Sequence, residues 1–230
     1  YSSLIKGFDG FEAIAFSEDK IYISIEAERD GEMIAYLAWG EIDSKSLEVN
    51  ISEDHIVPIN TPIQLGNMSF ESLLIDNNNI IMIYEANGSN LRKDARQTMF
   101  STKDEVTSYI NFPNIEYRIT DVTKMDNNGR FWAINYFWPG DKKLLSPGED
   151  NVLNKVKQGS THSKSNQIER LIEFQMNSGG ISISDTKPIQ LFLESDESRN
   201  WEAIARLGNR GLLIATDKHP RMILGYVQFK

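Results

Sequence analysis

The sequence contains no cysteine, so disulfide bonds and thiolate metal sites are excluded. It has only three histidines, which leaves carboxylate and amide oxygens as the main candidates for metal ligands. No apolar run approaches the roughly 18 residues that a membrane-spanning helix needs, and the mean hydropathy is -0.39. We therefore expect no membrane span and no sulfur-ligated metal.

Basic residues are fewer than acidic ones, 24 against 33, which gives a net charge of -9. This charge opposes binding to nucleic acid, which needs local positive potential. A small anionic substrate would need a local basic patch or a bridging cation. The sequence also lacks a Gly-x-Ser-x-Gly elbow and a phosphate-binding loop, so no motif supports serine-hydrolase or nucleotide chemistry.

The chain is long enough, at 230 residues, for one sizeable core, and we expect a single domain over residues 1–230. The sequence begins at Tyr1 and not at a methionine, from which we expect a processed leader and a secreted or periplasmic protein.

A hairpin pattern of short apolar strand, polar turn and second apolar strand occurs four times. In each copy an acidic residue opens the first strand, and an acidic or amide residue ends the second. The four pairs are Glu12 with Glu26, Glu71 with Glu85, Asp121 with Asn135, and Glu202 with Asp217. Repeats of this size with short strands are typical of a β-propeller.

The sequence therefore predicts an all-β propeller of four-stranded blades, with four blade repeats visible and a fifth not excluded. We expect the N-terminal segment, residues 1–7, to complete the last blade and close the ring. A long polar segment, residues 138–166, interrupts the third blade as a functional or mobile loop, with a short helix near Gly148–Val156. A β-sandwich of meander hairpins is the alternative fold.

The spacing within each pair predicts that the two acids face each other across the hairpin, where like charges repel. Three interpretations are open. Glu12, Glu71, Asp121 and Glu202 could hold a calcium ion on the propeller axis. Nearby lysine and arginine side chains could pair with the acids, or the acids could cap backbone N–H groups.

The turn after the last hairpin places three basic groups beside an acid. Lys218 and Arg221 could bind a phosphate or carboxylate, and we assign catalytic roles to Glu202, Asp217 and His219. A solvated turn is the alternative. In the inserted loop, Trp138 is a candidate for ligand contact, although packing is the more frequent role of tryptophan.

Three strings carry a family resemblance: Phe11–Ala15, Asn200–Ala205 and Leu212–Asp217. They resemble the phytase-like or esterase-like β-propeller family of secreted bacterial proteins, in which a motif of the form Asn-x-Glu-Gly-Ile-Ala opens a blade. This chain has Ala13, Ser72 and Ala203 where the family prefers glycine. The resemblance implies a propeller, export and calcium-dependent phosphoester hydrolysis.

Two functions follow from these patterns. The first is a calcium-dependent hydrolase of phosphoesters or esters, in which a metal-bound water attacks the substrate at the acidic site. The second is a non-catalytic propeller that binds a protein or glycan through its loops, with purely structural acids. Fold alone does not decide between them.

Overall fold

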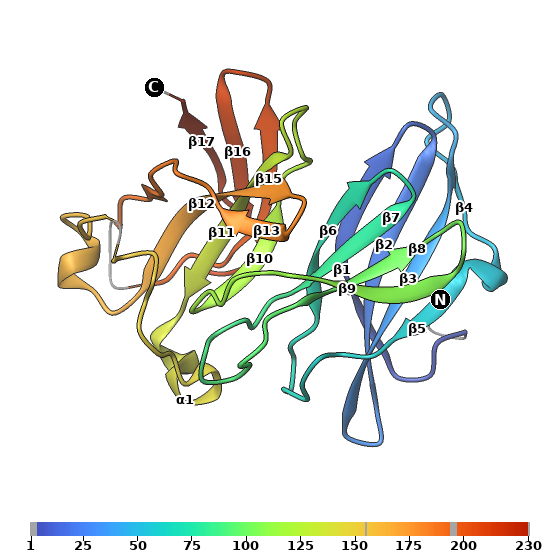
Figure 1. Ribbon diagram of the computed structural model, residues 1–230, viewed down its shortest axis with the longest axis horizontal. Coiled ribbons are helices and arrows are strands. Elements are labelled where there is room, and N and C mark those ends of the chain that lie inside the picture. Colours follow the sequence, from blue (N-terminus) through green and yellow to red (C-terminus); the bar gives the residue numbers. More distant parts are fainter. Residues whose placement is uncertain (1–3, 155, 194–196, 230) are drawn as a thin grey trace. The chain divides into compact units, whose positions relative to one another are not determined.

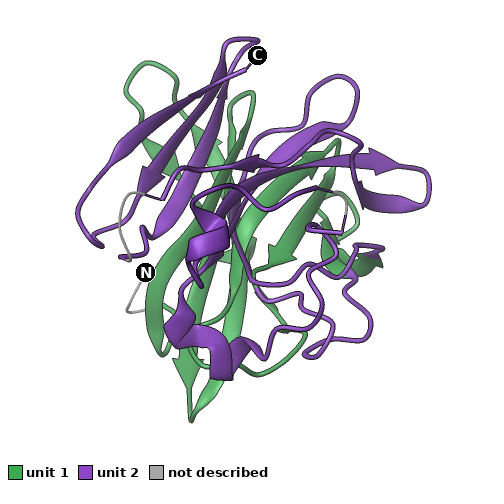
Figure 2. Cartoon of the chain, turned by 90° about the vertical axis from the view of Figure 1, so that its left-hand side faces the viewer, with its two compact units in different colours: residues 1–85, 97–109 green, residues 86–96, 110–230 purple. Residues whose placement is uncertain are grey.

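The computed structural model describes residues 4–154, 156–193 and 197–229. The chain divides into two compact units (Figure 2). Unit 1 comprises residues 1–85 and 97–109, and unit 2 comprises residues 86–96 and 110–230. The described part of the chain has no helix that is long and apolar enough to cross a membrane.

The first sheet of unit 1 is an antiparallel meander. Its strands are β1 (Phe8–Ser17), β2 (Lys20–Arg29), β3 (Glu32–Ile42), β4 (Val49–Asn50) and β5 (Ile56–Ile59). A 3₁₀ turn, η1 (Glu53–His55), precedes β5. The central strand β2 buries both of its faces along most of its length, while β1 alternates between exposed and partly buried residues. An edge strand and an inner strand are expected to differ in this way.

The second sheet of unit 1 contains β6 (Phe70–Asp76), β7 (Asn79–Tyr84), β8 (Gln97–Ser101) and β9 (Val106–Ile110), in that order. The hairpin between β6 and β7 turns through Asn77 and Asn78, and Asn77 has a positive φ of 56°. Asparagine tolerates this left-handed conformation better than most residues. The polar turn that the sequence predicts here is confirmed.

The first sheet of unit 2 contains β10 (Arg118–Val122), β11 (Arg130–Phe137), β12 (Ile168–Asn177), β13 (Gly180–Ile183) and β14 (Ile189–Gln190). The segment between β11 and β12 is the long insertion. It carries two 3₁₀ turns, η2 (Pro139–Asp141) and η3 (His162–Lys164), and one short helix, α1 (Lys142–Leu145). Figure 1 labels β10, β11, β12 and β13, and all strands of this sheet belong to unit 2.

The last sheet of unit 2 has three strands, β15 (Trp201–Leu207), β16 (Gly211–Thr216) and β17 (Leu224–Gln228). Its inner face packs on the preceding sheet through a cluster of buried apolar residues. Trp132, Leu171 and Trp201 are members of this cluster, and Ile223, Val227 and Phe229 lie against it. Burial of these large side chains stabilises the packing of the two sheets.

The structure confirms the all-β class and the four blade-like antiparallel sheets that the sequence predicts. The N-terminal segment does not complete the last sheet, as the sequence predicts, in its described part. Residues 1–3 lie outside the described part, but the Gly7 carbonyl accepts a hydrogen bond from the Glu28 N–H at 2.9 Å. The described part of this segment therefore bonds to β2 in the first sheet, and the last sheet has three strands among the described residues.

The inserted segment also differs from its prediction. Its helix is α1, at Lys142–Leu145, and the described residues of 148–156 form turns and irregular backbone. Ser146 ends the helix with a left-handed backbone, φ 41°. The last turn of a helix commonly closes in this way, so the polar run after Ser146 does not extend the helix.

Candidate functional site

Each of the four predicted metal ligands lies at a β-bulge in the first strand of its sheet. The pairing of the first two strands shifts register at Glu12 in β1, at Glu71 in β6, at Asp121 in β10 and at Glu202 in β15. All four residues are partly buried. A bulge leaves one residue without a direct cross-strand partner and redirects its side chain. The acidic repeat in the sequence is thus a repeat of bulges.

The prediction that the paired acids face each other is wrong. Glu26 lies opposite Gly10, and Asn135 lies opposite Ile119. Asp217 likewise lies opposite Asn200, because its N–H donates to the Asn200 carbonyl. In each case the residue opposite the second acid or amide lies two positions before the bulged acid. One position arises because the turn is centred half a residue earlier than the predicted spacing assumes. The other is the extra residue of the bulge. The expected repulsion between directly opposed acids does not arise.

Asp121 uses both carboxylate oxygens to bind backbone N–H groups. Its Oδ1 accepts from the Val122 N–H at 2.8 Å, and its Oδ2 accepts from the Ile204 N–H at 2.7 Å. The second bond joins β10 to β15, in the two sheets of unit 2. Burial raises the pKa of Asp121 to about 7, although these two hydrogen bonds act in the opposite direction. Backbone capping is the interpretation that fits this acid.

The described residues contain no group of three or more histidine, aspartate or glutamate side chains arranged to hold a metal ion. Asp121 in particular is a poor fit for an axial calcium ligand, because both of its oxygens already accept N–H donors. Glu12 and Glu71 belong to unit 1, while Asp121 and Glu202 belong to unit 2.

The second unit contains a hollow that we call the Trp138 pocket. Its volume is about 390 Å³, and it is lined by Arg118, Tyr136, Trp138, Asp141, Asn200 and His219. These residues come from the start of β10, the end of β11, the inserted segment, and the two ends of the β15–β16 hairpin. Two of them, Trp138 and His219, are residues that the sequence singles out.

Trp138 presents an indole ring that is 53% exposed, whereas Trp39, Trp132 and Trp201 are buried. The ring folds back over Gly140, so that a side chain on Gly140 would collide with it. The Asp141 N–H also donates to the Trp138 carbonyl at 2.9 Å, which closes the turn. The glycine therefore permits the ring to rest over its own turn.

Asp141 and Arg118 form the charged part of the pocket wall. Their side chains approach to 3.9 Å, and both are largely buried. Burial raises the pKa of Asp141, while the positive charge of Arg118 partly offsets this effect. Tyr136, beside them, has its pKa raised to about 12, chiefly by burial. Tyr136 is therefore a neutral donor at physiological pH.

The inserted segment is anchored at Glu116. One oxygen of this buried carboxylate accepts from the Ser89 N–H at 2.9 Å and from the Ser89 hydroxyl at 2.8 Å. The other oxygen accepts from the Gly148 N–H at 2.8 Å. Asn90 donates to the Ser146 carbonyl at 3.0 Å. The segment that carries Trp138 and Asp141 is thus fixed to the body of unit 2.

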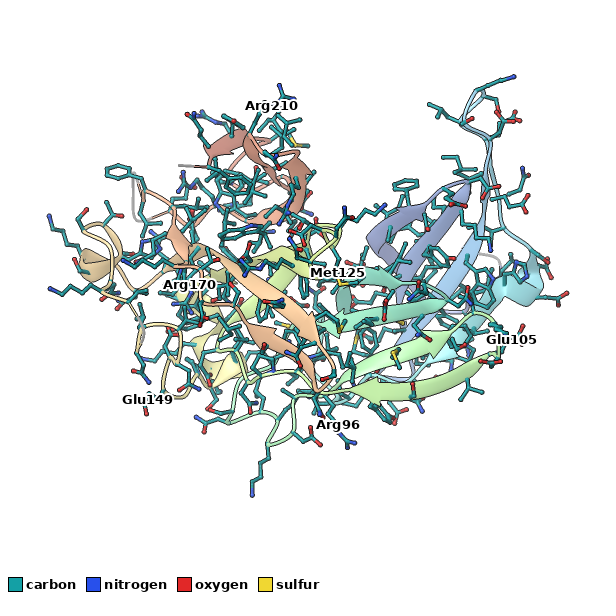
Figure 3. The ribbon with its side chains drawn as sticks, turned by 45° about the horizontal axis from the view of Figure 1, so that its top comes forward. Arg96, Glu105, Met125, Glu149, Arg170 and Arg210 are labelled. Carbon is teal, nitrogen blue, oxygen red and sulfur yellow. The ribbon has the colours of Figure 1, made fainter. Side chains whose placement is uncertain are left out.

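A second anchor is a buried ion pair between Arg170 and Asp150. The guanidinium donates to both carboxylate oxygens, at 2.7 and 2.9 Å, and its Nε donates to the Asn135 side chain at 2.8 Å. Asn135 in turn donates to the carbonyls of Glu116 and Arg118. Figure 3 labels Arg170 in β12 and Glu149 in the inserted segment. Asn135 therefore serves a structural network of hydrogen bonds.

A neighbouring hollow of about 340 Å³ is lined partly by Glu169, Arg199 and Arg221. Glu169 is fully buried, and its Oε2 accepts from the Arg199 Nε at 2.8 Å and from the Trp201 Nε1 at 2.7 Å. The Arg199 guanidinium also lies over the Trp201 ring, 5.2 Å from its centre. Arg221, predicted as a substrate-binding residue, belongs to this hollow.

The remaining residues predicted for catalysis or substrate binding belong to the β15–β16 hairpin and to the turn that follows it. Asp217, Lys218 and His219 are exposed on the turn after β16, and the His219 Nε2 is 3.7 Å from a carboxylate oxygen of Glu197. Glu202 accepts a hydrogen bond from the Asn200 side chain, which lines the Trp138 pocket. A catalytic role for Glu202, Asp217 and His219 stays a prediction.

Comparison with known proteins gives no family. No family model matches the sequence, and no curated protein matches it. Among solved structures, the catalytic domain of a GH62 alpha-L-arabinofuranosidase from Coprinopsis cinerea is similar at 7% identity and a TM-score of 0.37. The similarity covers 94% of this chain and 85% of that chain. Similarity at this level carries no conclusion about activity, and the phytase-like resemblance stays a prediction.

The sequence patterns assign no site role to four residues of the pocket: Arg118, Tyr136, Asp141 and Asn200. One local signal was present, because Asp141 follows Trp138 by three residues in a loop that has no strand pattern. Arg118 and Tyr136 gave no such signal. They lie opposite each other on β10 and β11 and look like ordinary strand residues until the strands are paired.

Proposed function

We propose that the Trp138 pocket binds a small anionic saccharide, which makes the chain a glycan-binding module. The observation that carries this proposal is the half-exposed indole of Trp138 in the same hollow as the Arg118–Asp141 pair. A pocket with an aromatic wall and a few polar groups is the usual form of a small-ligand site.

The lining groups match the chemistry of a sugar acid. The apolar face of a pyranose ring can stack on the indole of Trp138, and its hydroxyl groups can bond to Asp141 and Asn200. A carboxylate or phosphate on the sugar can be bound by Arg118 and by a ring N–H of His219. Local cations are needed here, because the net charge of -9 would otherwise repel an anion.

Titration with glucuronate, followed by tryptophan fluorescence and calorimetry, tests this proposal. We expect Trp138→Ala to weaken binding about tenfold or more, because loss of an aromatic contact removes roughly 1.4 kcal/mol. Gly140→Ala should weaken binding as well, since a methyl group at Gly140 displaces the indole ring. Tyr109→Ala removes an aromatic ring that is 62% exposed in β9 and should leave binding unchanged.

Glucose serves as the neutral comparison, and it should bind more weakly than glucuronate by a margin that shrinks in Arg118→Gln. The absence of glucuronate binding at millimolar concentration would contradict the proposal. So would equal binding by the native chain and Trp138→Ala.

A second candidate function, hydrolysis of phosphoesters or esters, is favoured by one observation. Asp141 lies in the Trp138 pocket, and burial raises its pKa, which is the direction that suits a general acid for a leaving oxygen. Glu202, Asp217 and His219 are the other predicted catalytic residues. Nitrophenyl ester and phosphate substrates, assayed with Asp141→Asn and Glu202→Gln, separate an enzyme from a binding module.

The same proposal includes export of the protein from the cell, which the phytase-like resemblance implies.

Calcium dependence is tested by thermal unfolding with calcium and with a chelator. A metal that binds only the folded chain stabilises it by about 2.7 kcal/mol at a concentration one hundred times its Kd. If Glu12, Glu71 or Glu202 takes part in a calcium site, the midpoint rises with calcium, and the rise is smaller in the corresponding glutamine variant. Equal midpoints in calcium and chelator would remove calcium from the proposal.

A further inference from the structure

The imidazole of His162 is buried near the end of the inserted segment. It belongs to η3 and is 1% exposed. Its Nε2 accepts a hydrogen bond from the Glu169 N–H, at the start of β12, at 3.0 Å. Its Nδ1 is also buried and has no hydrogen-bond partner among the described residues. Because Nε2 acts as an acceptor, the ring is neutral and carries its single proton on Nδ1.

A protonated imidazole does not fit this position. Imidazolium has two N–H donors and no acceptor. The new N–H on Nε2 would face the N–H of Glu169, and the hydrogen bond between the two groups would be lost. The N–H on Nδ1 would stay buried without an acceptor. Since a buried charge without partners is unfavourable, protonation favours a state in which the ring has left its site.

The charged groups around the ring do not compensate for this loss. They are Glu169 and Arg170 in β12, and Arg199 in the loop before β15. The Glu169 carboxylate would attract imidazolium, but its Oε2 already accepts from the Arg199 Nε at 2.8 Å. The two guanidinium groups oppose a further positive charge. The pKa of His162 is accordingly lowered from its ordinary value, chiefly by burial.

The backbone around the buried ring is held to β14 by a single side chain. We call this backbone, residues 157–165, the His162 segment. The Gly159 N–H donates to the Gln190 Oε1, and the Gln190 Nε2 donates to the Lys157 carbonyl at 2.9 Å. One amide group in β14 thus bonds to the segment in both directions.

The rest of the attachment also lies outside the strand ladder. The Leu193 N–H, which follows β14, donates to the Thr161 Oγ1 at 3.2 Å. The pairing of β11 with β12 joins residues 130–137 to residues 168–175 and includes no residue of the His162 segment. The segment can therefore leave its place without breaking the sheet on which it rests.

We propose that His162 is an acid-sensitive latch: protonation of its Nε2 by solvent breaks the bond to the Glu169 N–H and releases the His162 segment from β12 and β14. In the released segment the imidazole is hydrated, and its pKa returns to the ordinary value of 6.5. Because the pKa is lower in the closed state, closure is favoured above about pH 6.5 and loses this advantage as the pH falls below it. The segment is thus closed in a neutral medium and open in an acidic one.

Amide hydrogen exchange of the full chain, followed by NMR at pH 7.5 and pH 5, tests this proposal. We expect the protection of the Glu169 and Leu193 amides, corrected for the intrinsic exchange rate, to fall by up to about thirtyfold. This is the ratio of protonated to neutral imidazole at pH 5 for an ordinary histidine. The Thr123 amide, which bonds to the Trp132 carbonyl of the same sheet at 2.8 Å, is the reference and should keep its protection.

Variants isolate the contribution of this histidine, because the chain has three. The double variant His55→Gln with His219→Gln leaves His162 as the only histidine and should keep the full pH dependence. His162→Gln places an oxygen that does not titrate near the position of Nε2, where it can accept the Glu169 N–H, and should remove the pH dependence. His162→Phe supplies no acceptor and should lower the protection of the Glu169 amide at both pH values.

Three results would overturn the proposal. One is equal protection of the Glu169 amide at the two pH values in the native chain. Another is a pH dependence that persists unchanged in His162→Gln. The third is a parallel loss of protection at Thr123, which would mean that acid unfolds the whole sheet. No ligand of the Trp138 pocket enters the experiment, so this proposal does not rest on the proposed function.

Discussion

Asp150→Ala is expected to lower the free energy of unfolding of unit 2 by about 3–5 kcal/mol. The guanidinium of Arg170 is 1% exposed and donates to both oxygens of Asp150. Without the carboxylate, a buried positive charge keeps only its bond to Asn135 and its position 5.6 Å from the centre of the Tyr117 ring. Removing one partner of a buried pair costs more than the pair itself contributes, because the remaining charge is not solvated.

Denaturant unfolding followed by tryptophan fluorescence measures this loss, since three of the four tryptophans lie in unit 2. Glu149→Ala is the matched control. Glu149 is the exposed neighbour of Asp150 and bonds to the Asn154 side chain, so its removal should change stability by less than about 0.5 kcal/mol.

The double variant Arg170→Met with Asp150→Leu removes both charges and should recover much of the loss. Because Asp150 anchors the segment that carries Trp138, Asp150→Ala should also weaken ligand binding at the Trp138 pocket. A loss below about 1 kcal/mol in Asp150→Ala would mean that water reaches the guanidinium, as at a surface ion pair.

Asp121 is expected to make the chain more stable as the pH falls from about 7 to about 4. The pKa of Asp121 is about 7 in the folded chain, mainly because of burial, against 3.8 for the ordinary group. Between these two values the folded state holds a proton that the unfolded state has lost. Stability is therefore gained as the pH falls through this window, by at most about 4 kcal/mol at 1.36 kcal/mol per pH unit.

Denaturant midpoints measured at pH 5 and pH 8 for the native chain and for Asp121→Asn test this expectation. The difference between the two proteins removes the contributions of other groups. His162 is one such group, since burial lowers its pKa and it therefore acts in the opposite direction. Asp104→Asn, an exposed carboxylate in unit 1, is the control. If the pH dependence of Asp121→Asn equals that of the native chain, Asp121 does not titrate in this range.

Much of the fold could be predicted from local sequence. Alternating apolar runs joined by polar turns at Ser17–Lys20 and Asn77–Asn79 gave the correct hairpins. The recurring acid was predicted to open each first strand, and it instead marks the bulge within that strand. The residues that lie opposite each acid could not be predicted. A one-residue bulge cannot be distinguished from a regular strand in an apolar pattern of this length.

The candidate site was predicted only in part. Trp138 and His219 stood out as single residues, and Asp141 lies three positions after Trp138, but nothing in the sequence connected them with Arg118 and Asn200. The inserted segment was expected to be functional or mobile, and it is anchored by Glu116, in the loop before β10, and by Arg170, in β12. Those contacts depend on which strands pair, which no local pattern contains.

The sequence by itself determined the all-β class, the hairpins and the recurrence of an acid in each first strand, because strand and turn preferences act over a few neighbouring residues. Only the tertiary structure decided what each acid does. Asp121 caps the Ile204 N–H, and Asp141 joins Arg118 in a hollow. The donors and charges around a carboxylate are set by packing between strands distant in sequence, and they determine its protonation and its partners.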